Sequence, residues 1–132
     1  MDRARLEPFP LFSELGSDQL DAIASVATET EVEAGHELAI EGDFGHSLFA
    51  IEEGTADVSR DGEVVRTLGP GDIFGEVAVL SSGRRTATVV ATSPMRLITL
   101  FKRDVWALER RSPEAAERLR ALVADRLAGQ TS

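Results

Sequence analysis

Glycine recurs at short intervals through the middle of this chain, and that spacing constrains the fold more than any other feature. Between residues 28 and 101, short runs of β-branched and aromatic residues alternate with turn residues, a pattern typical of a small barrel or sandwich. Asp61-Gly62 is a strong hairpin signal, because both central residues of a type I′ turn need a positive φ. The glycines between the runs are Gly35, Gly42, Gly45, Gly54, Gly62, Gly69 and Gly71. The predicted strands are residues 29–33, 37–41, 47–52, 55–60, 63–68, 86–91 and 96–101.

Helical periodicity flanks this region on both sides. A predicted helix begins at Ser17 and ends near Ala27. The period becomes helical again from Lys102, and a last helix follows Ser112 as N-cap, with Pro113 in its first turn. The apolar stripe of this last helix is narrow, as in a helix packed on a neighbouring surface, and consists of Ala115, Leu119, Leu122, Val123 and Leu127. We expect this stripe to be exposed and to support a weak homodimer.

Size and composition predict one domain in a reducing compartment. A chain of 132 residues can bury most of its apolar surface in one core, but it is too short for a second domain. It contains no cysteine, and no apolar run approaches the roughly 18 residues that span a bilayer. We therefore expect a cytoplasmic protein with no membrane contact by this chain. The single domain, residues 1–132, would comprise a helical part at 8–27, a β part at 28–101 and C-terminal helices at 102–128.

The charge of the chain argues against nucleic acid as a partner. The formal net charge is −9, whereas nucleic-acid binding depends on basic patches that neutralise phosphates. A local cationic site is still compatible with this charge, because screening acts over roughly 8 Å at physiological ionic strength. Between Asp72 and Asp104 the only acidic residue is Glu76, so the surroundings of Arg84 and Arg85 can be cationic.

The segment from Phe74 to Val90 has the residues of an anion site. A Gly-Glu turn that opens a short helix leaves backbone N–H groups unpaired at the positive end of the helix dipole. Arg85 follows nine residues after Glu76 and can hold two phosphate oxygens at once, and Thr86 adds a hydroxyl. The alternative is a tight turn at the glycine with Arg85 on the surface. The N–H groups concerned are those of Gly75, Glu76, Val77 and Ala78.

The longer pattern around this segment resembles the cyclic nucleotide-binding domain family of the catabolite activator protein, the protein kinase A regulatory subunit and cyclic-nucleotide-gated channels. The resemblance extends from Pro10 to about Arg126. It is carried by Phe12-Ser13-Glu14-Leu15, Gly42-Asp43, residues 47–51 with Gly54, residues 68–76 and residues 84–89. It implies a mainly β, α+β fold: a jelly-roll (double-stranded β-helix, or β-roll) flanked by an N-terminal helix and two C-terminal helices. A short phosphate-binding helix would be inserted in it.

The resemblance also implies roles for individual residues. The cyclic phosphate would be bound by Arg85 and by the backbone amides of Gly75, Val77 and Ala78, and Glu76 would accept a hydrogen bond from the ribose 2′-hydroxyl. Phe74 and Ala87 complete the predicted ligand-binding segment. A cyclic phosphodiester is a monoanion, so one arginine and a helix start can neutralise it without a metal.

Thr86 leaves the base undecided, because its hydroxyl can meet either the phosphate or the 2-amino group of a guanine. Both cAMP and cGMP therefore stay open, with cAMP preferred on a composition that looks bacterial.

In domains of this kind the last helix closes over the base. Arg126 and either Leu122 or Val123 are the candidates for that contact, with the guanidinium stacked on the base. The alternative is that the helix only packs on the roll or on a second copy of the chain.

Two other functional classes receive less support. His36 and His46 with Glu41 or Asp43 could form a 2-His-1-carboxylate metal site on a cupin-like barrel, but a cupin has an H-x-H pair on one strand and none is present. No set of nucleophile, base and orienting group is visible. We expect no catalytic residue, no metal and no cofactor.

The predicted function is that of a sensor module that binds cAMP or cGMP and acts on a protein effector in cis or in trans. One alternative is the ligand-binding part of a catabolite-activator-like transcription regulator, which would need a helix-turn-helix after Ser132. Another is a structural domain that binds no nucleotide.

Overall fold

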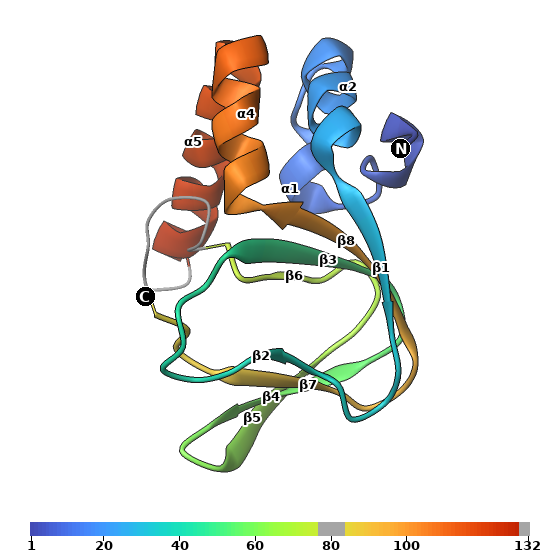
Figure 1. The fold of residues 1–132 in the computed structure, drawn as a ribbon, viewed down its shortest axis with the longest axis vertical. Helices are drawn as coiled ribbons and strands as arrows, with labels where there is room; N and C mark the ends of the chain where they lie inside the picture. Colours follow the sequence, from blue (N-terminus) through green and yellow to red (C-terminus); the bar gives the residue numbers. More distant parts are fainter. Residues whose placement is uncertain (77–83, 130–132) are drawn as a thin grey trace.

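The computed structural model of the chain describes residues 1–76 and 84–129. Helices occupy the two ends of the sequence and strands its middle (Figure 1). The helical elements are η1 (Arg3–Arg5), α1 (Pro10–Ser13), α2 (Ser17–Val26), α4 (Lys102–Arg111) and α5 (Pro113–Gly129). The strands are β1 (Thr28–Val32), β2 (Glu37–Ala39), β3 (Ser47–Glu53), β4 (Ala56–Arg60), β5 (Glu63–Leu68), β6 (Ile73–Phe74), β7 (Thr88–Ala91) and β8 (Met95–Phe101). None of the helices in the described ranges is long and apolar enough to cross a membrane.

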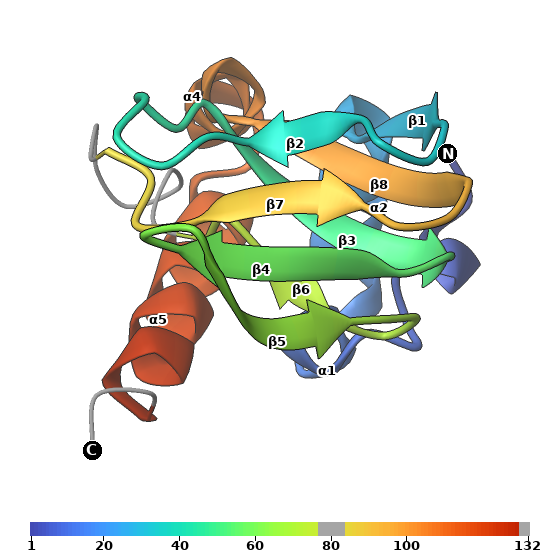
Figure 2. The same ribbon diagram turned by 90° about the horizontal axis from the view of Figure 1, so that it is seen from below.

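The strands form two four-stranded antiparallel sheets with the orders β1-β8-β3-β6 and β2-β7-β4-β5. The first sheet lies between the helices and the second sheet (Figure 1). The edges of the second sheet are formed by β2 and β5 (Figure 2). Strands adjacent in space are mostly distant in sequence, as in a jelly-roll. The predicted fold class, a β-roll flanked by helices, is therefore confirmed.

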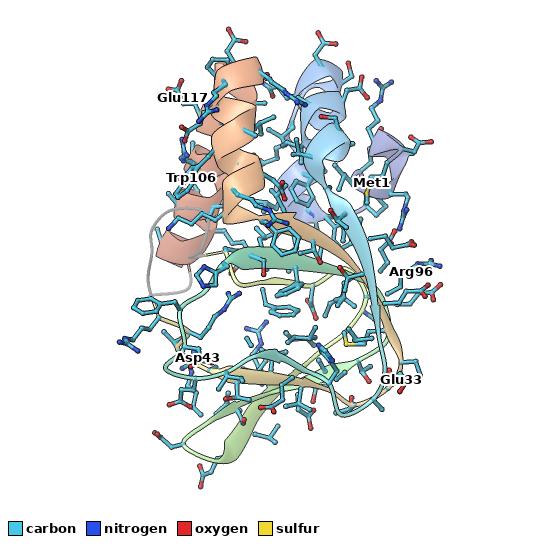
Figure 3. The ribbon with its side chains drawn as sticks, in the orientation of Figure 1. Met1, Glu33, Asp43, Arg96, Trp106 and Glu117 are labelled. Carbon is cyan, nitrogen blue, oxygen red and sulfur yellow. The ribbon has the colours of Figure 1, made fainter. Side chains whose placement is uncertain are left out.

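Strand β3 explains why the first sheet is covered on both faces. Successive side chains of a strand point to opposite faces. Leu48 and Ala50 belong to the core shared with the helices, whereas Phe49 and Ile51 belong to the core between the sheets. Side chains of both sheets project into the space between them in Figure 3. The run of apolar residues in β3 thus contributes to two cores. The core between the two sheets forms the interior of the roll.

Helix α5 packs differently from the prediction. The stripe residues Ala115, Leu119, Leu122 and Val123 lie inside the helical core, where α5 contacts α1, α2 and α4. Ala115, Leu119 and Val123 have no exposed surface, and Leu122 is 6% exposed. The expectation of an exposed stripe is therefore wrong, because η1 and α1, which the sequence pattern did not reveal, complete the helical layer with α2. A homodimer through this stripe loses its basis, and self-association stays an untested prediction.

The predicted turns agree with the structure, and most predicted strand ends agree within one residue. Strand β2, however, ends at Ala39 and not at residue 41. Asp61 and Gly62 have φ values of 50° and 82°, which confirms the tight hairpin between β4 and β5. Strand β7 begins at Thr88 instead of residue 86, and the two-residue strand β6 was not predicted. The predicted short helix after Gly75 lies outside the described residues.

Candidate ligand-binding site

A cavity of about 390 Å³ opens between the two sheets of the roll. Apolar side chains from both sheets form much of its wall, as in most small-molecule sites, and they include Val58, Ile73, Phe74 and Val89. Phe74 is held in place by Phe49, on which it stacks with a centroid distance of 5.0 Å. The polar part of the wall includes Arg85 and Thr86, both predicted as ligand-binding residues. Among the described residues of the wall, four are arginines and none is acidic.

Two glycines allow Arg85 to lie against the backbone of the roll. A methyl group on Gly75 would lie 2.5 Å from Arg85 Nη1 and 2.6 Å from the carbonyl oxygen of Ser47. One on Gly45 would lie 2.9 Å from Arg85 Nε. Gly75 also has a φ of 80°, a conformation that other residues adopt only with strain. The sequence Phe-Gly-Glu therefore has a glycine where a guanidinium approaches the chain closely.

Arg85 is fixed by the protein without being neutralised. Its Nη2 donates a hydrogen bond to the carbonyl oxygen of Ser47 at 2.8 Å, and its backbone N–H donates to the carbonyl oxygen of Asp43 at 2.6 Å. Within the described ranges, Arg85 has no carboxylate at ion-pair distance. Burial lowers the pKa of Arg85 from its ordinary value, and the more distant charge of Glu76 opposes this shift.

A half-buried cation with most of its five donors unused attracts an anion. The cavity wall therefore has the electrostatics of an anion site at the position where the sequence predicts the phosphate.

Glu76 has a partner that the sequence did not predict. It is 7% exposed, and its Oε1 accepts a hydrogen bond from Nε of Arg126 at 2.8 Å. Arg126 Nη2 also donates to the carbonyl oxygen of Ile73 at 3.4 Å. Arg126 is thus joined to the residue predicted to bind the ribose, and a direct contact of Arg126 with a base stays a prediction. Leu122 and Val123 lie in the helical core and not in the cavity wall.

The structure brings together most of the predicted set and adds residues to it. Phe74, Gly75, Arg85, Thr86 and Ala87 all line the cavity. The predicted amides of Val77 and Ala78 lie outside the described residues.

The sequence reasoning missed several wall residues, among them Arg60, Val65, Arg66 and Arg84. Alternation along the strand at 55–60 could have revealed that Val58 and Arg60 share a face with the cavity.

A metal centre gains no support from the structure. No cluster of three or more histidine, aspartate or glutamate side chains is placed to hold a metal ion within residues 1–76 and 84–129. The His36 backbone is engaged in hydrogen bonds with Glu33 and Ala91, and the carbonyl oxygen of His46 accepts one from Lys102 at 2.8 Å.

Comparison with known proteins identifies the family to which these features belong. The family model of the cyclic nucleotide-binding domain matches residues 29–112. This chain belongs to the cyclic nucleotide-binding domain family. The match covers most of the β-roll, including Gly75, Glu76 and Arg85, and it extends through helix α4.

Relatives of this cyclic nucleotide-binding domain include regulatory proteins. The cyclic AMP receptor protein of Thermus thermophilus is 37% identical over 89% of this chain and 57% of its own length. A cAMP-dependent protein kinase regulatory subunit of Yarrowia lipolytica is 40% identical over 74% of this chain and 26% of its own length. The chain thus spans about a quarter to somewhat more than half of these relatives.

A solved structure is similar over the whole length of this domain. The N-terminal domain of a transcriptional regulator from Streptomyces coelicolor has a TM-score of 0.81 and 29% identity, and the match covers 99% of this chain and 96% of that one.

Proposed function

We propose that this chain is a regulatory module that binds a 3′,5′-cyclic nucleotide, cAMP or cGMP, in the cavity of its β-roll. The single observation that carries the proposal is Arg85, a half-buried guanidinium without an ion pair among the described residues, packed on Gly45 and Gly75 in the cavity wall. The cyclic phosphate would bind Arg85 bidentately together with the amides of Gly75, Val77 and Ala78. The apolar wall between the sheets would receive the base.

Glu76 would couple the ligand to helix α5. Its carboxylate has several acceptor sites, one of which is occupied by Arg126 at 2.8 Å. A ribose 2′-hydroxyl that donates to the same carboxylate changes the environment of this ion pair, and α5 responds to it as the helix that closes the site. Because a ligand shifts an equilibrium only by its differential affinity for the two states, the Glu76–Arg126 pair is a point where such a difference can arise.

The wider setting is part of the same proposal. The module would bind its ligand without catalysis and without a metal or cofactor, in the cytoplasm, where the lack of cysteine is natural. It would act on a protein effector in cis or in trans and not by itself on nucleic acid.

A second candidate is the sensor part of a catabolite-activator-like transcription regulator. It is supported by the match to the Thermus thermophilus receptor protein, of which the chain spans 57%.

Isothermal titration calorimetry with cAMP and with cGMP tests the proposal. We expect binding by the natural protein and a loss of about 2–5 kcal/mol, or roughly 30- to several thousand-fold in Kd, for Arg85→Ala. Arg110→Ala on α4 is the matched control, because it removes the same charge from an exposed position outside the cavity. Circular dichroism of each variant shows that the fold is retained. The proposal would be contradicted if neither nucleotide binds, or if Arg85→Ala binds them as tightly as the natural protein does. Either result would favour a structural domain.

A further inference from the structure

Helix α4 has a basic and aromatic face on the side opposite its core contact. Val105 and Leu108 are buried in the helical core, and the side chains on the opposite side of the helix are exposed. Trp106, the single tryptophan of the chain, is 54% exposed there. Figure 3 shows it on the outer side of α4, away from α2. The exposed residues of this α4 face are Arg103, Trp106 and Arg110, and Lys102 borders them.

The arginines of the α4 face are unmatched, whereas the acidic side chains of the same helix are engaged elsewhere. Asp104 caps the start of α4 by accepting a hydrogen bond from a backbone N–H at 3.1 Å. Glu109 is ion-paired with Arg120 of α5. The guanidinium groups of Arg103 and Arg110 have no hydrogen bond or ion pair to a described residue. The α4 face is therefore locally cationic on a chain whose formal net charge is −9.

Helix stability explains only part of this charge. Basic side chains stabilise the last turn of a helix and destabilise the first, because the helix dipole is positive at its start. Arg110 lies in the last turn, but Lys102 and Arg103 lie in the first. Lys102 Nζ is 5.6 Å from the ring centroid of Trp106. The Arg103 guanidinium lies 4.8 Å from the ring centroid of Phe101. The first turn thus places cations beside aromatic rings against the preference of the helix dipole.

A surface of this composition suits an acidic protein segment. Tryptophan and arginine are the residues that most often dominate the energetics of protein–protein interfaces. An extended anionic surface, such as a membrane or a nucleic acid, would also face the acidic remainder of the domain and be repelled by it. A short segment that stays within the screening length of about 8 Å meets mainly the cations of the α4 face. The charge distribution therefore favours a peptide-like partner.

We propose that the α4 face binds an acidic segment of an effector protein, with an apolar side chain on Trp106 and carboxylates on Arg103 and Arg110. The inference rests on the proposed function only for the partner's role as effector. Helix α4 packs on α5, and Arg126 of α5 is bound to Glu76. The effector would thus dock beside the helix that is joined to the candidate site.

Fluorescence anisotropy of a labelled synthetic peptide that repeats Glu-Glu-Leu tests the proposal. We expect saturable binding together with a change in tryptophan emission. Because the chain has one tryptophan and no tyrosine, this emission reports on the α4 face alone. Raising the ionic strength from about 0.1 M to about 1 M shortens the Debye length from about 10 Å to about 3 Å, and it should weaken binding roughly tenfold.

Variants of exposed residues locate the binding. Trp106→Ala should weaken peptide binding by about 5- to 30-fold, as for an interface hot spot. Arg103→Gln combined with Arg110→Gln should weaken it by about 3- to 30-fold. Arg118→Gln is the matched control, because it removes the same charge from an exposed position on α5, and its affinity should stay within about twofold. All variants should keep the circular dichroism and the cyclic nucleotide affinity of the natural protein, since the α4 face lies outside the cavity.

Three results would overturn the docking proposal. They are absence of peptide binding, equal binding of a peptide that repeats Gln-Gln-Leu, and unchanged peptide affinity in the α4 variants. Binding to phosphatidylserine vesicles without binding to the acidic peptide would overturn it in favour of a lipid surface. Peptide binding without nucleotide binding contradicts the proposed function alone, and nucleotide binding without peptide binding contradicts this inference alone.

Discussion

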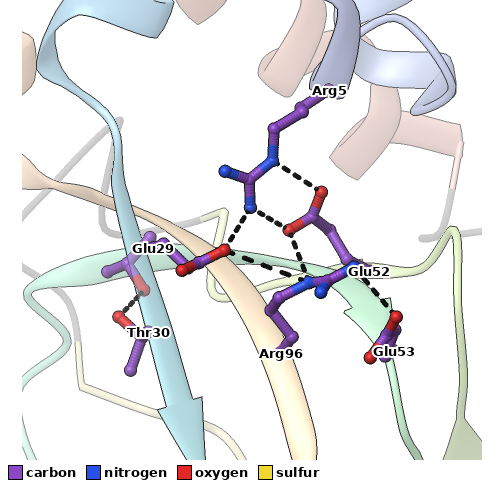
Figure 4. A network of polar contacts seen from close by, with 7 residues as sticks. Arg5, Glu29, Thr30, Glu52, Glu53 and Arg96 are labelled. Carbon is purple, nitrogen blue, oxygen red and sulfur yellow. Dashed lines mark hydrogen bonds and ion pairs between the residues drawn. The ribbon is translucent and has the colours of Figure 1, made fainter. Parts of the chain in front are cut away.

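Arginines at the two ends of the β-roll have opposite surroundings. At the end marked by Arg96 in Figure 3, Arg5 and Arg96 share the carboxylate of Glu52. Figure 4 shows this paired cluster, which consists of Arg5, Glu29, Glu52, Glu53 and Arg96. Toward the end marked by Asp43 in Figure 3, Arg85 is held by the carbonyl oxygen of Ser47 and lies close to two glycines, and no carboxylate of the described residues pairs with it.

The directions of the pKa shifts follow from this difference. Hydrogen bonding to Glu52 is the largest of the effects that raise the pKa of Arg5, whereas burial lowers the pKa of Arg85. The cluster at Arg96 uses its charges to join η1, β1, β3 and β8, and its positive charges are matched within the chain. The cavity leaves a positive charge for a ligand to match. Arginine alone is therefore no sign of a binding site, and the lack of an internal carboxylate is the informative observation.

The largest expected effect concerns Gly75, whose backbone lies against the guanidinium of Arg85. Gly75→Ala combines a positive φ, costing about 1–2 kcal/mol, with an overlap on Ser47 and Arg85 that costs about 1–3 kcal/mol. We expect a loss of about 2–5 kcal/mol in the free energy of unfolding by urea. Gly62→Ala is the control, because Gly62 has a φ of 82° but nothing within 4 Å of the added methyl group. Equal losses in the two variants would show that the close approach is unimportant.

The second effect concerns the carboxylate that the paired cluster shares. Glu52 is 13% exposed, and Glu52→Gln leaves two arginines without their common counter-charge. We expect a loss of about 1–3 kcal/mol in the free energy of unfolding and no change in nucleotide affinity. Glu53→Gln, at a side chain that is 63% exposed, should cost less than about 1 kcal/mol. A change in nucleotide affinity for Glu52→Gln would break the distinction between the two ends of the roll.

The third effect concerns Arg126. It forms an ion pair with Glu76, like the arginines of the paired cluster, although it lies beside the candidate site. Arg126→Ala leaves Glu76, 9% exposed at its side chain, without its partner. We expect a loss of about 1–2 kcal/mol in the free energy of unfolding. The loss stays at this size because the Arg126 side chain is 27% exposed, so water can hydrate Glu76 once Arg126 is removed. Arg118→Ala on the exposed face of the same helix should change it by less than about 0.5 kcal/mol. Equal stabilities of the two variants would show that the Glu76–Arg126 pair contributes nothing to the stability of the fold.

The smallest effect concerns the stability of the ligand-free protein without Arg85. Arg85→Ala removes a desolvated cation along with one hydrogen bond to Ser47, so the two contributions oppose each other. We expect the free energy of unfolding to stay within about 0.5 kcal/mol of the natural protein. A loss above about 2 kcal/mol would mean that Arg85 stabilises the fold, as the arginines of the paired cluster do, and would remove the contrast between the two ends.

The sequence pattern pointed to residues that lie together in one part of the cavity wall. Phe74, Gly75, Arg85, Thr86 and Ala87 were predicted to bind the ligand, and all five line the cavity. They could be recognised together because they lie close together along the chain and because glycine and arginine have strong local preferences, and their binding of a ligand stays a prediction. The opposite wall could not be predicted in the same way. Arg66 meets the cavity only because β5 pairs with β4 and β4 pairs with β7, and such pairings depend on contacts between distant parts of the chain.

The sequence alone determined the alternation of glycine and strand residues, the hairpin at Asp61-Gly62, the start of the last helix and the residues that suit a phosphate. These are local features, set by backbone conformation and side-chain chemistry over a few residues. Tertiary structure decided which arginines are neutralised, how α5 is buried and that Arg126 joins Glu76 across 50 positions of sequence. Those outcomes depend on the packing of distant segments, since a charge is matched or left free only by what the fold places beside it.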